Sequence, residues 1–177
     1  MALLARPTWG AYVRQRRPSV DSLWHLPYGR RMDAADIDLR KATYAAFVEL
    51  GRAPSAAAVA SASGLSEAEV REGWRRLHDA HALVLDERGE IRMANPFAAQ
   101  PTSFRVEAAG RSWFANCAWD AFGIGAALKV DSTIHTECAD CHVPLDIDVR
   151  DGRPDDTTLV FHVLVPAVSW WDDIGYT

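Results

Sequence analysis

The chain has 177 residues, which suits one domain or two small ones, and its 49% hydrophobic and 24% charged residues are typical of globular proteins. The net charge of −5 excludes a general positive field for nucleic acids. No apolar stretch is long enough to cross a bilayer, and the first residues lack signal-peptide features. The three cysteines do not suggest a secreted disulfide framework. We therefore expect a cytoplasmic protein with reduced thiols and no membrane partner.

Residues 1–32 form an N-terminal arm rich in arginine and aromatic side chains, with six arginines and a single acid, Asp21. Such an arm could hold phosphates or a partner. Packing of its aromatic side chains on the rest of the protein is the preferred interpretation, because amphipathic side chains cover apolar surface well.

Residues 33–95 are predicted to form a winged helix-turn-helix-like domain. The apolar periodicity over 33–50 predicts a first helix, and a short second helix is expected over 56–62. Ser66 and Glu69 form a capping box that predicts the start of a third helix. Two short strands with a tight turn follow the helices, which completes the order of a winged helix.

A winged helix raises the question of DNA binding. The third helix and the hairpin together carry at least as many acids as bases, although phosphate neutralisation normally supplies much of the affinity for DNA. DNA therefore stays open as a partner but is not favoured, and a scaffold or dimerisation role is preferred. The sequence does not determine the oligomeric state.

Residues 102–177 are predicted to form a small α+β domain around an antiparallel sheet, after a linker over 95–100. The expected elements are strands over 103–108 and 111–114, a helix over 116–129, and strands over 133–137, 143–149 and 159–165. The predicted fold class is thus α+β, with a winged-helix-like helical unit followed by a small antiparallel-sheet domain.

Cys117 and Asp120 are the most informative pair of side chains. In a helix their i, i+3 spacing would place both on one face. A soft nucleophile beside a proton donor is suited to bind a soft metal and to protonate a group attached to it. Two residues of common type also fit a buried cysteine and a helix-N-terminal aspartate, which is the simpler interpretation of the pair alone.

The segment 138–142, with the sequence C-A-D-C-H, admits several interpretations. Haem attachment would need export and an axial ligand, and a redox motif would need a strand-to-helix setting. A structural zinc site lacks a second cysteine pair and is not favoured, although Cys138 and Cys141 stay candidate metal ligands. The preferred interpretation is a buried Cys138 at a strand end and Cys141 in the following turn.

The segments 104–112 and 116–120 resemble the organomercurial (alkylmercury) lyase family, most specifically in N-C-A-W-D. The resemblance continues through Cys138 and runs on to residues 163–166 and 170–173. It extends to 33–95, since family members join a winged-helix-like region to a distinctive α+β catalytic domain.

The resemblance implies an active site of two cysteines and an aspartate. Cys117 matches the first cysteine, which binds mercury, Asp120 matches the aspartate, and Cys138 matches a cysteine usually regarded as structural. The second catalytic cysteine is expected shortly after the final segment, and the sequence ends at Thr177 without it. The resemblance therefore implies a truncated or divergent member. Cys138 or Cys141 could substitute only within about 4 Å of Cys117.

The activity implied by the resemblance is thiolate binding of R-Hg⁺ and protonolysis of the carbon–mercury bond, giving R-H and Hg(II). Mercury would arrive as substrate, no organic cofactor is expected, and the partners would be an organomercurial small molecule and thiols. One alternative is a non-enzymatic winged-helix regulator or metal-binding module that uses the three cysteines. Another is a family relative with different small-molecule chemistry.

Overall fold

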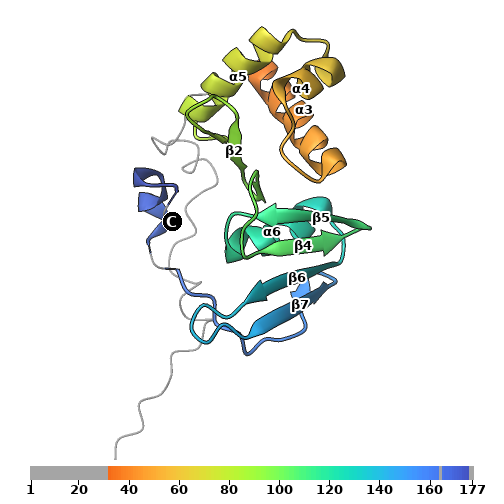
Figure 1. Ribbon diagram of the computed structural model, residues 1–177, viewed down its shortest axis with the longest axis vertical. Coiled ribbons are helices and arrows are strands. Elements are labelled where there is room, and N and C mark those ends of the chain that lie inside the picture. The colour runs from red at the N-terminus through yellow and green to blue at the C-terminus, as the bar shows by residue number, and fades with distance from the viewer. Residues whose placement is uncertain (1–31, 164, 176–177) are drawn as a thin grey trace, which may run out of the picture.

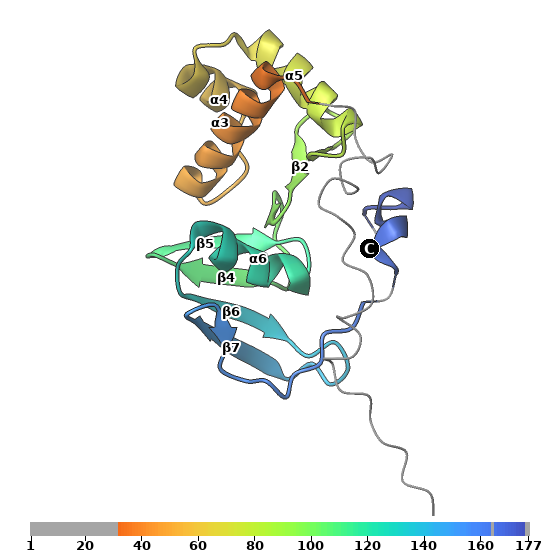
Figure 2. The same ribbon diagram turned by 180° about the vertical axis from the view of Figure 1, so that it is seen from behind.

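A computed structural model describes residues 32–163 and 165–175 of the chain. Three helices precede an antiparallel sheet, and a further helix covers one face of that sheet (Figures 1 and 2). The predicted α+β class is confirmed. The arm over residues 1–31 lies outside the described residues, and the winged-helix assignment and the domain limits stay predictions.

The three N-terminal helices begin and end at residues that the sequence marks. They are α3 (Ala34–Leu50), α4 (Ala56–Ser63) and α5 (Glu67–Asp79). Ser66 and Glu69 form the expected capping box at the start of α5, so backbone N–H groups that a helix leaves unpaired find acceptors. Gly51 and Gly64 end α3 and α4 in the left-handed conformation, which glycine adopts readily.

Aromatic side chains fill the core of this helical unit. Trp74 of α5 is fully buried, and its indole N–H donates to the hydroxyl of Thr43 on α3 at 2.9 Å. The hydroxyl of Thr43 in turn donates to the carbonyl of Leu39 at 2.8 Å. The polar atom of the largest buried side chain is therefore paired, as a stable core requires.

Eight strands form one sheet in the order β1-β2-β3-β5-β4-β6-β7-β8, and every neighbouring pair is antiparallel. Their bounds are β1 Val84–Leu85, β2 Ile91–Ala94, β3 Phe97–Ala98, β4 Arg105–Ala108, β5 Arg111–Ala115, β6 Ser132–Glu137, β7 Pro144–Arg150 and β8 Arg153–Pro154.

Strand β3 lies inside the segment that the sequence predicts as a linker, so that prediction is wrong over residues 97–98. The reason is Phe97, which is 2% exposed and stacks on Phe47 of α3 with ring centroids 5.2 Å apart. By pairing with both β2 and β5, β3 makes one continuous sheet of the hairpin after α5 and the strands beyond it.

Helix α6 (Ala118–Leu128) covers one face of β4, β5 and β6 (Figure 2). Alternate side chains of these strands, such as Val106, Trp113 and Ile134, are buried, as expected for a sheet packed on one face. The approach is close at Gly125, where a Cβ atom would lie 2.6 Å from the hydroxyl oxygen of Ser132 on β6. A glycine is therefore needed at this position.

The expected strand over 159–165 does not form in its described residues. Its apolar side chains have no strand partner, and Val160 is 89% exposed. The segment leads to the 3-10 helix η1 (Ala167–Asp172), which lies beside the hairpin of β2 (Figure 1). Here Trp171 stacks on His81 with ring centroids 4.0 Å apart. Within the described residues no helix is both long and apolar enough to cross a membrane.

Candidate active site

The turn from strand β5 into helix α6 positions the two predicted site residues. Cys117 is the N-cap of α6, with extended backbone (φ −153°, ψ −179°), and Asp120 lies in the first turn. The carbonyl of Cys117 accepts the first helical hydrogen bond, from the N–H of Ala121 at 2.9 Å. The helix therefore holds the thiol and the carboxyl at the same end, as the i, i+3 spacing predicts.

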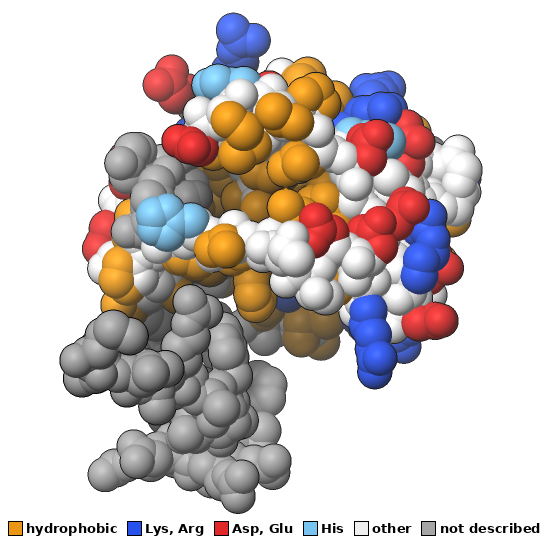
Figure 3. All heavy atoms as spheres, turned by 90° about the horizontal axis from the view of Figure 1, so that it is seen from below, with side chains coloured by type: hydrophobic (Ala, Val, Ile, Leu, Met, Phe, Trp, Pro, Cys, Tyr) orange, Lys and Arg blue, Asp and Glu red, His pale blue; other side chains and the backbone are white. Residues whose placement is uncertain are grey.

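Cys117 and Asp120 line the same cavity, which has a volume of about 310 Å³. Its other walls come from segments that are distant in the sequence: Met93 and Asn95 after α5, Phe104 before β4, and Phe161, His162, Val163, Val165, Trp170, Ile174 and Gly175 of the C-terminal segment. Seen from below, one face of the molecule has hydrophobic side chains gathered in a hollow (Figure 3). A concave, largely apolar site with a few polar groups is typical of small-molecule binding.

Burial governs the ionisation of the Cys117 thiol. It raises the pKa of the thiol, because the thiolate loses its hydration. The main-chain amides of Asp120 and Trp119 act in the opposite direction, whereas the charge of the Asp120 carboxylate adds to the increase in pKa. Free Cys117 is thus a protonated thiol near neutral pH, and a metal that binds it displaces the proton.

The Asp120 carboxyl is 9% exposed, and burial raises its pKa from the usual value for aspartate. One hydrogen bond opposes this effect: the side-chain amide of Asn116 donates to Oδ2 of Asp120 at 3.0 Å. With Oδ2 accepting, Oδ1 is the oxygen that can carry the proton. The arrangement keeps a proton donor beside the thiol at higher pH than an exposed aspartate would allow.

Asn116 is a site residue whose role the sequence does not indicate. Its amide nitrogen also lies 3.2 Å from Oδ1 of Asn95 and 3.3 Å from the carbonyl oxygen of Phe97. It therefore ties the Asp120 carboxyl to the segment at β3. The signal in the sequence is the i, i+4 spacing of Asn116 and Asp120 at a helix start, which is too common to single out a site.

Cys138 and Cys141 lie in the turn between β6 and β7 and do not line the cavity of Cys117. The register places Phe114, Arg105 and His135 side by side on β5, β4 and β6. Cys117 follows β5 into helix α6, whereas Cys138 directly follows β6 and leads into the turn to β7. The structure thus brings Cys117 and Asp120 together and leaves the other two cysteines apart.

The contacts of the α5 arginines are relevant to whether this helix could bind DNA. Each of the three contacts a carboxylate, at distances of 2.7 Å for Arg71 with Glu90, 2.8 Å for Arg75 with Glu72, and 2.8 Å for Arg76 with Asp36. The positive charge of this helix is therefore balanced locally, and the structure adds no support for a phosphate-binding face.

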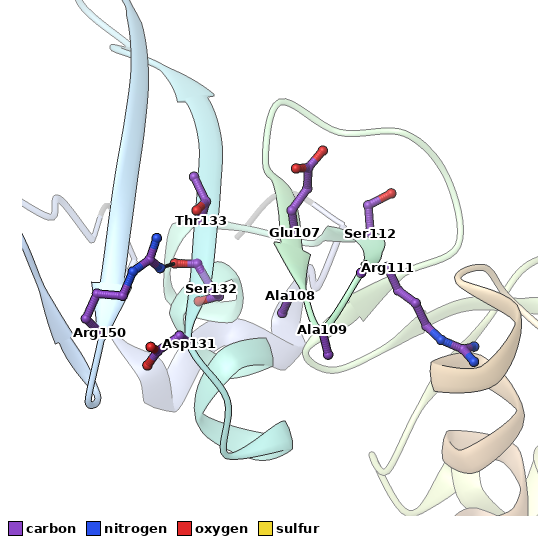
Figure 4. A pocket seen from close by; sticks show the side chains of 10 residues that line it. Glu107, Ala108, Ala109, Arg111, Ser112, Asp131, Ser132, Thr133 and Arg150 are labelled. Carbon is purple, nitrogen blue, oxygen red and sulfur yellow. Dashed lines mark hydrogen bonds between the residues drawn. The ribbon is translucent and has the colours of Figure 1, made fainter.

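A second cavity, of about 600 Å³, lies at the β4–β5 turn and has no thiol in its lining. Figure 4 shows that Arg150 extends toward Ser132, whereas Arg111 points away toward α3. Arg150 donates to the carbonyl of Ser132 at 2.8 Å, and Arg111 donates to the carbonyl of Glu49. With both guanidinium groups already paired, this cavity is not the better candidate for chemistry.

Comparison with known proteins finds a match over the region that contains most of the cavity lining. Residues 97–177 match the family model of alkylmercury lyase, MerB, and no curated protein matches the chain. A solved structure, the crystal structure of the mercury-bound form of MerB2, superposes with a TM-score of 0.57 at 24% identity. The match covers 72% of this chain and 62% of that chain, and it shows a shared fold. Residues 97–177 therefore belong to the alkylmercury lyase family, which confirms the family predicted from the sequence.

Proposed function

We propose that this protein cleaves the carbon–mercury bond of organomercurials, with Cys117 as the mercury-binding thiolate and Asp120 as the proton donor. The observation that carries the proposal is the shared cavity, in which a thiol and a desolvated carboxyl face one volume. Family membership of residues 97–177 supports the reaction class.

In the first step an organomercurial enters as its complex with a small thiol. The Cys117 sulfur forms a bond to mercury while the bond between mercury and the small thiolate breaks. The proton of the Cys117 thiol goes to the leaving thiolate. Soft sulfur ligands compete well for a soft metal, so the raised pKa of the buried thiol does not prevent the exchange.

In the second step the carboxylic acid of Asp120 transfers its proton to the carbon bound to mercury. The electron pair of the carbon–mercury bond forms the new carbon–hydrogen bond, so R-H leaves and Hg(II) stays on Cys117. Cys117 is the one cysteine in the cavity lining, so a second sulfur ligand would come from a thiol in solution. Its electron density would make the carbon more basic, and the low exposure of Asp120 raises the pKa of the acid and so favours the protonated form.

The test is methylmercury turnover in the presence of excess monothiol. The wild-type chain should release methane and Hg(II), measured by gas chromatography and by mercury analysis. Cys117→Ser should lose both binding and turnover. Asp120→Ala should keep methylmercury but lose methane production by about 10²- to 10⁴-fold, the usual contribution of a general acid.

Asp38→Asn is the matched control for the carboxyl, because Asp38 lies on the surface of α3 with 74% of its side chain exposed. This variant should turn over methylmercury at the wild-type rate. A wild-type chain that retains methylmercury on Cys117 in excess thiol, yet releases no methane, would contradict the proposal.

A further inference from the structure

The proposed reaction leaves two thiols unused, in the loop that joins β6 to β7. The N–H of Cys138 donates to the carbonyl of Val143 at 2.9 Å, and the carbonyl of Cys138 accepts from the N–H of His142 at 2.9 Å. His142 has a left-handed backbone (φ 56°), which lets the chain reverse within this loop. Cys138 and Cys141 are thus held in one closed turn.

Both thiols are free and open to solvent, since Cys141 is exposed and Cys138 is partly exposed. The two cysteines stand three residues apart in a turn closed by the hydrogen bond from the N–H of His142 to the carbonyl of Cys138. The amides of Cys141 and Asp140, followed by the Cys141 thiol, lower the pKa of Cys138. The neighbouring His142 ring points its Nδ1 toward Oε1 of Glu137, at 3.4 Å. The turn therefore presents two sulfurs that can act together.

The number of side chains available as ligands determines which kind of metal ion this turn can bind. Among residues 32–163 and 165–175 no group of three or more histidine, cysteine or acidic side chains is placed to hold a metal. Zinc in protein sites takes four ligands, whereas a soft ion that accepts two sulfurs fits a pair. Two thiols on one short loop also act as a chelate, because the second binds at a high effective concentration after the first.

The pair lies at the same end of the sheet as Cys117. Strands β5 and β6 are both antiparallel to β4, so they run in the same direction and end on the same side. Cys117 follows the end of β5, and Cys138 follows the end of β6. The cavity and the turn therefore lie at the same edge of the sheet.

We infer that Cys138 and Cys141 form a chelating acceptor site for Hg(II), which takes the ion from Cys117. The source of the ion rests on the proposed function, whereas the chelation does not. In the transfer two sulfur–mercury bonds form, to Cys138 and Cys141. The bonds from mercury to Cys117 and to the small thiolate break. The two protons of the acceptor thiols go to the two departing sulfurs, and no atom changes oxidation state.

The first experiment uses the full chain with Cys117→Ser, reduced and then mixed with inorganic Hg(II) in excess monothiol. After desalting it should retain one mercury per chain with two sulfur ligands by X-ray absorption. Adding Cys141→Ser should weaken retention by about 10²-fold or more, the loss expected for a chelate reduced to a single thiol. Ala139→Ser, which changes the same turn but keeps both thiols, should behave like Cys117→Ser.

Loss of mercury from Cys117→Ser, or equal retention with and without Cys141, would overturn the inference. So would equally firm retention of Zn(II). A wild-type chain that makes no methane but passes this test would leave the acceptor site standing and remove only the proposed function.

The second experiment locates the ion after transfer. Trypsin cleaves after Arg111, Lys129 and Arg150, so Cys117 and the Cys138–Cys141 pair fall on different peptides. After a single turnover, or after loading with one equivalent of inorganic Hg(II), mass spectrometry should find mercury on peptide 130–150. Mercury that stays on peptide 112–129 would overturn the transfer.

Discussion

Burial raises the pKa of both side chains at the candidate site, with opposite consequences for the two chemical roles. For Asp120 it favours the neutral carboxyl, which is the form that donates a proton. For Cys117 it disfavours the thiolate, which is the form that binds metal. The low polarity of the cavity thus suits the acid directly, and a soft substrate has to displace the proton of the thiol.

The raised pKa of Asp120 predicts how stability depends on pH. Because the folded state holds this proton more tightly than the unfolded state, stability is fully present below the usual aspartate pKa of 3.8 and falls as pH rises through the raised value. Asp120→Asn keeps the shape and removes the ionisation. The denaturation midpoint of this variant should therefore rise, relative to that of the wild type, as pH increases from 3.8 through the raised pKa of Asp120. Parallel curves for the two proteins would contradict the prediction.

Asn116→Ala is the companion variant for the pH profile. The amide of Asn116 lowers the pKa of Asp120 by donating to the carboxylate, so its removal should move the same loss of stability to higher pH. The pH range over which stability falls, and not only the size of the fall, then reports on this hydrogen bond.

The sequence could identify Cys117 and Asp120 because both residues come from one helix start, where spacing alone sets the geometry. It could not assign a role to Asn116, because the partners of Asn116 include Asn95 and Phe97 as well as Asp120. It could not predict the cavity either, since its walls join residues from 93 to 175. Burial and the pKa changes that it causes depend on these long-range contacts.

At the scale of elements, the fit of α6 on the sheet depends on the absent side chain at Gly125. A Cβ there would lie 2.6 Å from Oγ of Ser132 and 3.2 Å from its Cβ. Gly125→Ala should destabilise the fold by about 1–2 kcal/mol, because overpacking outweighs the gain in helix propensity. Chemical denaturation measures this change.

Ser132→Ala is the matched partner of that variant. The Ser132 hydroxyl is buried and has no hydrogen-bond partner, so its removal alone should cost little. In the double variant it should recover part of the stability lost in Gly125→Ala, because the nearest clashing atom is gone. Strictly additive effects on the free energy of unfolding would show that the two residues are not in contact.

Elements with local signals at their ends were predictable, and the two errors lack such signals. Helices α3, α4 and α5 follow caps in the sequence, and the strands β4 to β7 alternate in polarity. The two residues of β3 sit between prolines, and only the burial of Phe97 makes them a strand. The run 159–165 is apolar enough for a strand, but Phe161, Val163 and Val165 line the cavity instead of pairing.

At the scale of the whole molecule, the C-terminal segment closes the cavity by contacts at two points. Phe161 lies against Trp119, with ring centroids 6.2 Å apart, and Trp171 stacks on His81 after α5. Both ends of the outer wall are therefore anchored to elements that come much earlier in the chain. These aromatic contacts hold the outer wall of the cavity in place.

Trp171→Ala should loosen this wall at a cost of about 0.5–1.5 kcal/mol for the lost ring contact. Water would then reach Asp120 more easily, and the pKa of its carboxyl should fall toward the usual range. The pH profiles of stability and of methane release should shift to lower pH. Val160→Ala, at a side chain that is 89% exposed, should change neither profile.

The strand that bridges the helical unit and the later strands also limits how the protein can be divided. A fragment beginning at residue 102 would keep Cys117 and Asp120 but leave the backbone of β5 without its partner β3. An uncovered strand edge invites pairing with other chains, so such a fragment would be prone to aggregate. Work on the proposed mercury chemistry in isolation would therefore require residues 97–98 to be retained, together with the aromatic contacts that hold them.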